Sequence, residues 1–65
     1  MGLKCYLKEY RKKANLTQDE LANLVNVRRE TIGRLESGQY NPSLELALRI
    51  ADAVNAPIEE IFKLK

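Results

Sequence analysis

The stretch LTQDELANLVNVRRETIGRLESGQYNPS, residues 16–43, decides the fold of this chain. Its apolar residues recur every three or four positions, which is typical of helices that bury one face. Only Asn26 and Val27 separate two helical segments, at about 18–25 and 28–37. So short a connection cannot fold the second helix back antiparallel to the first. It forces a steep crossing near Ala22, whose small side chain lets the two backbones approach.

The starts of two helices are marked by capping residues. Thr17 and Glu20 fit a capping box, in which each side chain accepts a hydrogen bond from the backbone N–H of the other residue. Ser43 follows Asn41 and Pro42 as the expected N-cap of a later helix. A short helix, a tight turn and a second helix together predict a helix-turn-helix at about residues 17–37.

Three asparagines and one glycine mark the ends of helices. Asparagine accepts the left-handed conformation that ends a helix more readily than most other non-glycine residues. Asn15, Asn26 and Asn55 each follow an apolar-periodic segment, and Gly38 is the fourth such residue. No segment alternates with period two over a useful length, so no strand is predicted. The sequence therefore predicts an all-α bundle of five helices, at about 3–14, 18–25, 28–37, 44–54 and 58–63.

The composition is that of one small globular domain, residues 1–65, with 45% hydrophobic and 31% charged residues. No apolar run approaches the roughly 20 residues of a membrane span, and no signal-peptide pattern is present. The single cysteine, Cys5, excludes an internal disulfide, which suits a reducing cytoplasm. We expect a cytoplasmic protein without a membrane partner, with Cys5 as a small packing residue or a semi-exposed residue of the first helix.

An enzyme is not expected. The chain has no histidine, and Cys5 has neither a base partner nor companions spaced as metal ligands. The carboxylates stand on helix faces beside Lys or Arg, as in most soluble helices. The sequence therefore predicts no catalytic residue, no metal site and no cofactor.

The net charge of +2 is unevenly distributed, because basic residues gather in the first fourteen positions. A basic end is compatible with a polyanionic partner. A solvated helix face has the same composition, so charge alone does not decide between the two.

The helix at about 28–37 has two different faces. At about 100° per residue, its polar set centres about 200° from Ile32 and Leu35. The polar set is Arg29, Glu30, Gly33 and Arg34. One face is thus suited to a core, and the other to base edges in the major groove of DNA.

Each polar residue of this helix has a specific chemistry. Arg29 can donate two hydrogen bonds to guanine, and Arg34 can do the same or bind a phosphate. Glu30 can accept from the amino group of cytosine, or it can pair with Arg34 one turn later. Gly33 has no side chain to offer a base, and it suits a close approach of the backbone to DNA.

The pattern L-T-Q-x-E-L-A-x-x-V-x-V-x-R-x-T-I-x-x-L-E-x-G-x-x-x-P-S resembles the phage-repressor/Cro-type helix-turn-helix family, often called XRE-like. The similarity covers about residues 7–62 and is greatest to minimal stand-alone regulators. It implies a compact, lambda-repressor-like bundle of about five helices. It also implies a sequence-specific transcriptional regulator, a repressor, that places the helix at about 28–37 in the major groove.

The resemblance implies roles for individual residues. Those that match base-reading positions are Arg29, Glu30, Gly33, Arg34 and Gln18. Those that match or flank DNA-backbone contacts are Thr17, Arg28, Thr31, Gln39, Tyr40 and Asn41. Arg11 and Glu36 match a largely buried ion pair between the first and third helices. Arg28 departs from the family, which has Ser or Thr as N-cap there, and brings a cation suited to a phosphate.

One reading helix covers only about four or five base pairs, too few to find one site in a genome. A homodimer on a palindromic operator of double-stranded DNA is therefore expected. The residues considered for the dimer surface are Leu44, Leu48, Ile61, Phe62 and Leu64. For the last three of these, a place in the core remains open. The alternative function is a protein-interaction module of the same fold, either antitoxin-like or a partner of another regulator.

Overall fold

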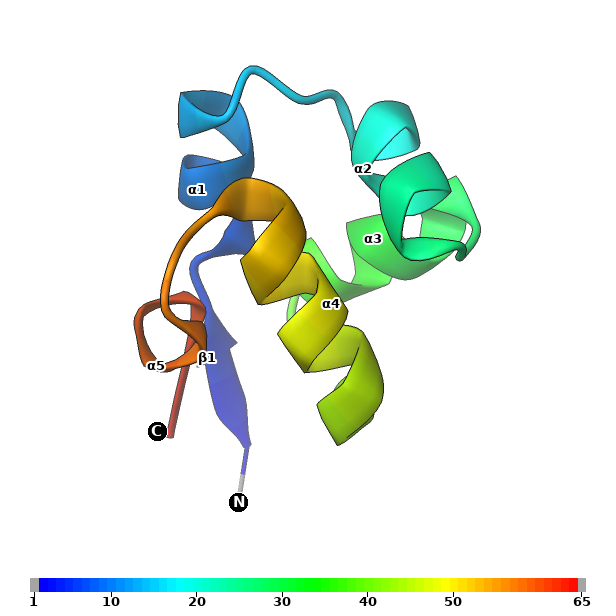
Figure 1. Ribbon diagram of the computed structural model, residues 1–65. Helices are drawn as coiled ribbons and strands as arrows, with labels where there is room; N and C mark the ends of the chain where they lie inside the picture. The colour runs from blue at the N-terminus through cyan, green and yellow to red at the C-terminus, as the bar shows by residue number, and fades with distance from the viewer. Residues whose placement is uncertain (1, 65) are drawn as a thin grey trace.

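The computed structural model describes residues 2–64 and contains five short helices and two short strands (Figure 1). Met1 and Lys65, the ends of the expected single domain, lie outside the described residues. The elements are β1 (Leu3–Cys5), α1 (Leu7–Lys13), α2 (Gln18–Val25), α3 (Arg29–Glu36), α4 (Leu44–Val54), α5 (Ile58–Ile61) and β2 (Phe62–Leu64). The helices form a compact bundle in which α2 crosses α3 steeply, as expected for a helix-turn-helix.

The predicted helix ends are confirmed. Asn15, Asn26 and Asn55 have φ angles of 60°, 62° and 56°, in the left-handed region, and Gly38 has a φ of 78°. The left-handed residue turns the chain out of the helix and lets the following N–H groups bond the last carbonyls. After α2, for example, the N–H of Val27 donates to the carbonyl of Ala22 over 2.9 Å.

The predicted helix starts at Thr17 and Ser43 are also confirmed. The Thr17 hydroxyl accepts from the N–H of Glu20 at 3.0 Å, and the Glu20 carboxylate accepts from the N–H of Thr17 at 2.8 Å. The Ser43 hydroxyl accepts from the N–H of Leu46 at 3.2 Å. These caps satisfy N–H groups that would otherwise lack partners in the first turn.

The absence of strands is the part of the prediction that was wrong. Residues 3–5 form β1 and not the start of a helix, so Cys5 lies on a strand, and α5 ends at Ile61. β1 and β2 pair antiparallel with Leu3 opposite Leu64. The N–H of Tyr6 then donates to the carbonyl of Ile61 at 2.7 Å, which ends the ribbon and starts α1. A strand of three residues is too short to show an alternating pattern in the sequence. The backbone hydrogen bonds of each strand also depend on the other strand, which lies at the opposite end of the chain.

The core is built from apolar residues of all five helices. Ile32 and Leu35 of α3 are fully or almost fully buried, as their spacing predicted. Ala22 is also buried, at the closely packed contact between α2 and α3. The members of the core are Leu7, Leu21, Ala22, Val25, Ile32, Leu35, Leu46, Ile50, Val54 and Ile61. This core fixes one face of α3 and leaves the opposite face in solvent.

Within residues 2–64, none of the helices is both long and apolar enough to cross a membrane.

Candidate nucleic-acid interface

The solvent face of α3 carries the polar residues expected to read DNA. Arg29, Glu30 and Arg34 are exposed, while Thr31 and Gly33 are partly exposed. Apart from Gly33 itself, its two chain neighbours and the backbone of α3, no atom lies within 4 Å of the point where a Cβ of Gly33 would stand. Packing inside the molecule therefore does not require glycine there, and the position leaves open space on this face.

The Arg28 side chain is exposed at the start of α3. Arg28 is the N-cap residue, with φ −80° and ψ 152°, and within the described chain its side chain makes no capping hydrogen bond. The N–H of Thr31, which a serine or threonine cap would bond, donates instead to the carbonyl of Arg28 over 3.0 Å. The positive end of the helix dipole and the Arg28 guanidinium together make the beginning of α3 electropositive.

Glu30 and Arg34 are one turn apart on α3, but they do not form an ion pair. Among the described residues, the two ion pairs are Arg11–Glu36 and Glu45–Arg49. Glu30 and the guanidinium of Arg34 thus remain available to an outside partner. With Arg28 and Arg29 beside them, the exposed face has a positive balance of charge.

The loop after α3 is attached to the end of that helix. The N–H of Gly38 donates to the carbonyl of Leu35 at 3.2 Å, and the N–H of Gln39 donates to that of Arg34 at 2.9 Å. Gln39, Tyr40 and Asn41 follow as exposed residues. The loop therefore leaves α3 in a fixed direction, with three exposed residues that carry polar groups next to the end of that helix.

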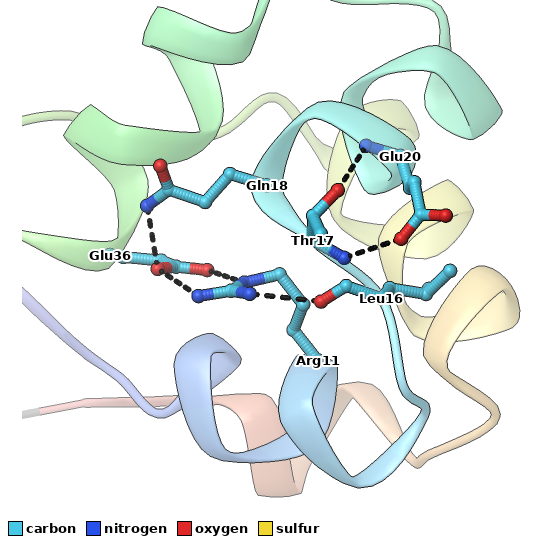
Figure 2. Close-up of polar contacts among 6 residues, drawn as sticks. All are labelled: Arg11, Leu16, Thr17, Gln18, Glu20 and Glu36. Carbon is cyan, nitrogen blue, oxygen red and sulfur yellow. Dashed lines mark hydrogen bonds and ion pairs between the residues drawn. The ribbon is translucent and has the colours of Figure 1, made fainter.

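A largely buried ion pair connects α1 to the end of α3 (Figure 2). The Arg11 guanidinium donates to both oxygens of Glu36, from Nε over 2.7 Å and from Nη2 over 3.2 Å. Its Nη1 donates to the carbonyl of Leu16 at 2.9 Å. The side chains of Arg11 and Glu36 are only 9% and 6% exposed. Burial weakens solvent screening, so removing one partner strands a charge at a cost of about 3–5 kcal/mol.

Gln18 is held by this ion pair, which the sequence did not predict. Its Nε2 donates to Oε1 of Glu36 over 3.0 Å, and the residue is partly buried at the start of α2 (Figure 2). Thr17 precedes it, exposed, with its hydroxyl used in the capping box. The family pattern indicated a partner for Glu36 on α1 alone. The contact with Gln18 depends on how α2 packs on α3, and no local spacing reports that.

The residues considered for a dimer surface divide into three groups. Leu44, Leu48 and Leu64 are 72%, 52% and 71% exposed, and Phe62 is partly buried against the core. Ile61 is 0% exposed, so of the two places left open for it, the core and a dimer surface, it takes the core, and the dimer-surface alternative is wrong for this residue. Its side chain packs in the core because α5 is a single turn with its apolar side inward.

An apolar groove of about 670 Å³ lies between the start of α4 and the β-ribbon. Its lining includes Leu3, Pro42, Leu44, Phe62 and Leu64. Two of the three exposed leucines named above are at its edge.

Cys5 is partly buried on β1, and burial raises the pKa of its thiol. The nearby Glu36 carboxylate raises the pKa further, while a hydrogen bond from the Leu7 backbone acts in the opposite direction. The reactive thiolate is therefore disfavoured. Over residues 2–64, no three His, Cys, Asp or Glu residues are grouped as a metal site would require.

The sequence matches known regulators. The model of the helix-turn-helix family HTH_3 matches residues 7–61. An uncharacterized HTH-type transcriptional regulator from Archaeoglobus fulgidus is 62% identical over 56 residues, which cover 86% of this chain and 79% of the relative.

The fold matches solved regulators. The restriction-modification controller protein C.AhdI from Aeromonas hydrophila superposes with a TM-score of 0.77 and 37% identity, over 83% of this chain and 82% of that one. The clp gene regulator ClgR from Corynebacterium glutamicum superposes with a TM-score of 0.78 and 28% identity. That match covers 83% of this chain but 57% of ClgR. The five-helix arrangement is thus shared with both regulators.

Proposed function

This chain belongs to the helix-turn-helix family HTH_3, and on that basis we propose that it is a sequence-specific regulator of transcription. It binds double-stranded DNA with α3 in the major groove and acts as a repressor in the cytoplasm, at the nucleoid. The observation that carries this proposal is the exposed face of α3, where arginines surround Glu30 opposite a fully packed apolar face.

The proposed contacts follow from exposure and chemistry. Arg29 lies at the first position of α3 and is suited to a guanine, since residues near the start of a recognition helix reach base edges. Glu30 and Arg34, unpaired with each other, are proposed to read further bases. The proposed contacts to sugar and phosphate are Thr17, Arg28, Thr31, Gln39, Tyr40 and Asn41.

Gly33 contributes to the proposed interface without a side chain. The open space around its Cα lets α3 approach the floor of the groove closely at this point. The position cannot make a polar contact with a base, so more of the sequence preference rests on Arg29 and Glu30.

The regulator is proposed to act as a homodimer on a palindromic operator. One α3 covers too few base pairs for a unique site, and two copies double the length of sequence read. The groove edged by Leu44 and Leu64 supplies apolar surface that a second copy would cover. Burial of apolar surface is the dominant favourable term in most protein association.

The experiment that tests the function is selection of bound sequences from a random pool of double-stranded DNA. The expected result is enrichment of one palindrome, with an affinity that falls steeply as salt rises because phosphate contacts release counterions. Tight binding to a protein, with no DNA bound at low salt, would replace this function by the alternative of a protein-interaction module. Non-palindromic enrichment would contradict the homodimer.

A further inference from the structure

The Glu36 carboxylate lies between Arg11, which belongs to α1, and Gln18, which belongs to α2 (Figure 2). Its Oε2 accepts from Arg11 over 2.7 Å, and its Oε1 accepts from Arg11 over 3.2 Å and from Gln18 over 3.0 Å. The bonds to Arg11 join α1 to α3. The bond to Gln18 connects the same carboxylate to the start of α2, beside the reading helix.

This arrangement fixes which way the Gln18 amide faces. An ionised carboxylate only accepts hydrogen bonds. It therefore accepts one from the amide N–H of Gln18 and repels the amide oxygen. Figure 2 shows the oxygen of Gln18 on the side away from Glu36. Among residues 2–64 no donor bonds that oxygen. The side chain therefore presents a free acceptor, with one N–H remaining beside it.

We propose that Glu36 is a positioning residue for DNA binding, which turns the Gln18 oxygen toward the amino group of a base. This inference rests on the proposed function, because it assigns a role within the same interface. Phosphate oxygens are acceptors and cannot bond the Gln18 oxygen. The donors that the major groove offers are the amino groups of adenine and cytosine, so Gln18 contributes to sequence preference.

Two substitutions distinguish a role of Glu36 in orienting Gln18 from a role in the stability of the fold. Gln18→Met keeps the length of the side chain and removes both polar groups. Glu36→Gln keeps the shape at position 36 but can accept or donate, so it no longer dictates the orientation of the Gln18 amide. Arg11→Lys is the matched control, because it weakens the ion pair and leaves the bond between Glu36 and Gln18.

The test is a double-mutant cycle on DNA discrimination. Affinities of wild type, both single variants and the double variant are measured for the selected operator and for operators changed at one base pair each. We expect Gln18→Met to remove a preference of about 5- to 100-fold at one base pair. Glu36→Gln should reduce the same preference, and adding it to Gln18→Met should change nothing further.

The control is expected to behave differently. Arg11→Lys should unfold at lower urea concentration than wild type and keep the full preference at that base pair. If Glu36→Gln does not fold, Glu36→Asp replaces it: this variant keeps the charge for Arg11 but is too short to hold Gln18.

Three results would overturn the proposal. Glu36 is only structural if its substitution lowers stability and leaves every base preference intact. Gln18 binds phosphate if Gln18→Met weakens binding to all DNA sequences equally. If the wild-type protein selects no sequence at all, the proposed function fails together with this inference, whereas the first two results leave that function standing.

Discussion

Arg28 and Arg29 are neighbours with different positions relative to α3. Arg28 is the N-cap and has extended backbone angles, whereas Arg29 is the first residue of the helix. Both are exposed, and in the described chain neither takes part in an ion pair. Residue type alone therefore does not distinguish their proposed roles, but position does. Arg28 flanks the helix, and Arg29 lies in its first turn, from which residues of a recognition helix reach base edges.

We predict that Arg29→Ala weakens binding to the selected operator by about 1–3 kcal/mol and relaxes preference at one base pair. The physical reason is the loss of two hydrogen bonds to guanine. The measurement is competition binding against operators changed at single positions. Equal weakening on all sequences would show that Arg29 contacts phosphate.

Arg28→Ala is the matched comparison. This substitution should weaken binding to all DNA sequences alike, because a phosphate contact carries no sequence information. Its plot of log affinity against log salt should be less steep by about one unit. An unchanged slope would exclude Arg28 from the backbone contacts.

A second prediction concerns the turn between α2 and α3. Asn26→Ala should lower the free energy of unfolding by about 1–2 kcal/mol, because alanine is strained at a φ of 62°. Asn26→Gly should leave stability within a few tenths of a kcal/mol, since glycine adopts this conformation without a Cβ clash. Urea unfolding measures both. Equal effects of the two substitutions would contradict the conformational argument.

At the scale of elements, local signals predicted the helices well and the strands not at all. Thr17, Ser43 and the asparagines act on neighbouring backbone groups, so their spacing reports where α2 and α4 start and end. The bond between β1 and β2 joins residues about sixty positions apart, and no local pattern encodes it. The contact of Gln18 with Glu36 could not be predicted for the same reason, because it joins residues of two different helices. The exposed face of α3, by contrast, was predictable from helical spacing.

The β-ribbon contains a like-charge pair that can be tested. Lys4 and Lys63 are directly opposite each other in the ribbon, and both are exposed. The Nζ atom of Lys63 also lies 5.5 Å from the centre of the Tyr6 ring. Facing cations repel, so Lys4→Glu should raise the free energy of unfolding by about 0.2–1 kcal/mol. Changing Lys4 leaves the contact of Lys63 with Tyr6 in place.

The control for the ribbon is Lys4→Gln, which removes the repulsion without adding an attraction. It should give a smaller gain in stability than Lys4→Glu, measured by thermal unfolding. The difference between the two variants should shrink in about 1 M salt, where charges are screened over about 3 Å. A loss of stability in Lys4→Glu would mean that the paired charges do not repel appreciably.

At the scale of the whole molecule, two of the surfaces that carry exposed leucines can be compared. Leu44 and Leu64 edge the groove between α4 and the ribbon, while Leu24 is 62% exposed on α2. Unlike the surface around Leu24, the groove combines several apolar residues, among them Leu3, Leu44 and Leu64, in a concave surface. A surface of this kind marks an association site more often than a single exposed side chain does.

We predict that Leu44→Gln raises the dissociation constant of the homodimer about tenfold or more, since full burial of a leucine between copies contributes about 1.5–3 kcal/mol. Leu24→Gln is the matched control on α2 and should leave the dimer intact. Sedimentation over a range of protein concentrations measures the dimer, and urea unfolding checks that both variants fold. Dissociation by Leu24→Gln alone would move the interface to α2.

The pairing of Leu3 with Leu64 also bears on the order in which the chain folds. Joining two segments so far apart costs more chain entropy than forming a helix, so the ribbon should close after the helices have packed. Lys4→Glu should then slow unfolding and leave the folding rate nearly unchanged. Stopped-flow kinetics in urea measure both rates, and faster folding would indicate early pairing. Late closure would make the ribbon a determinant of how long a folded molecule persists, and the helices a determinant of how quickly one forms.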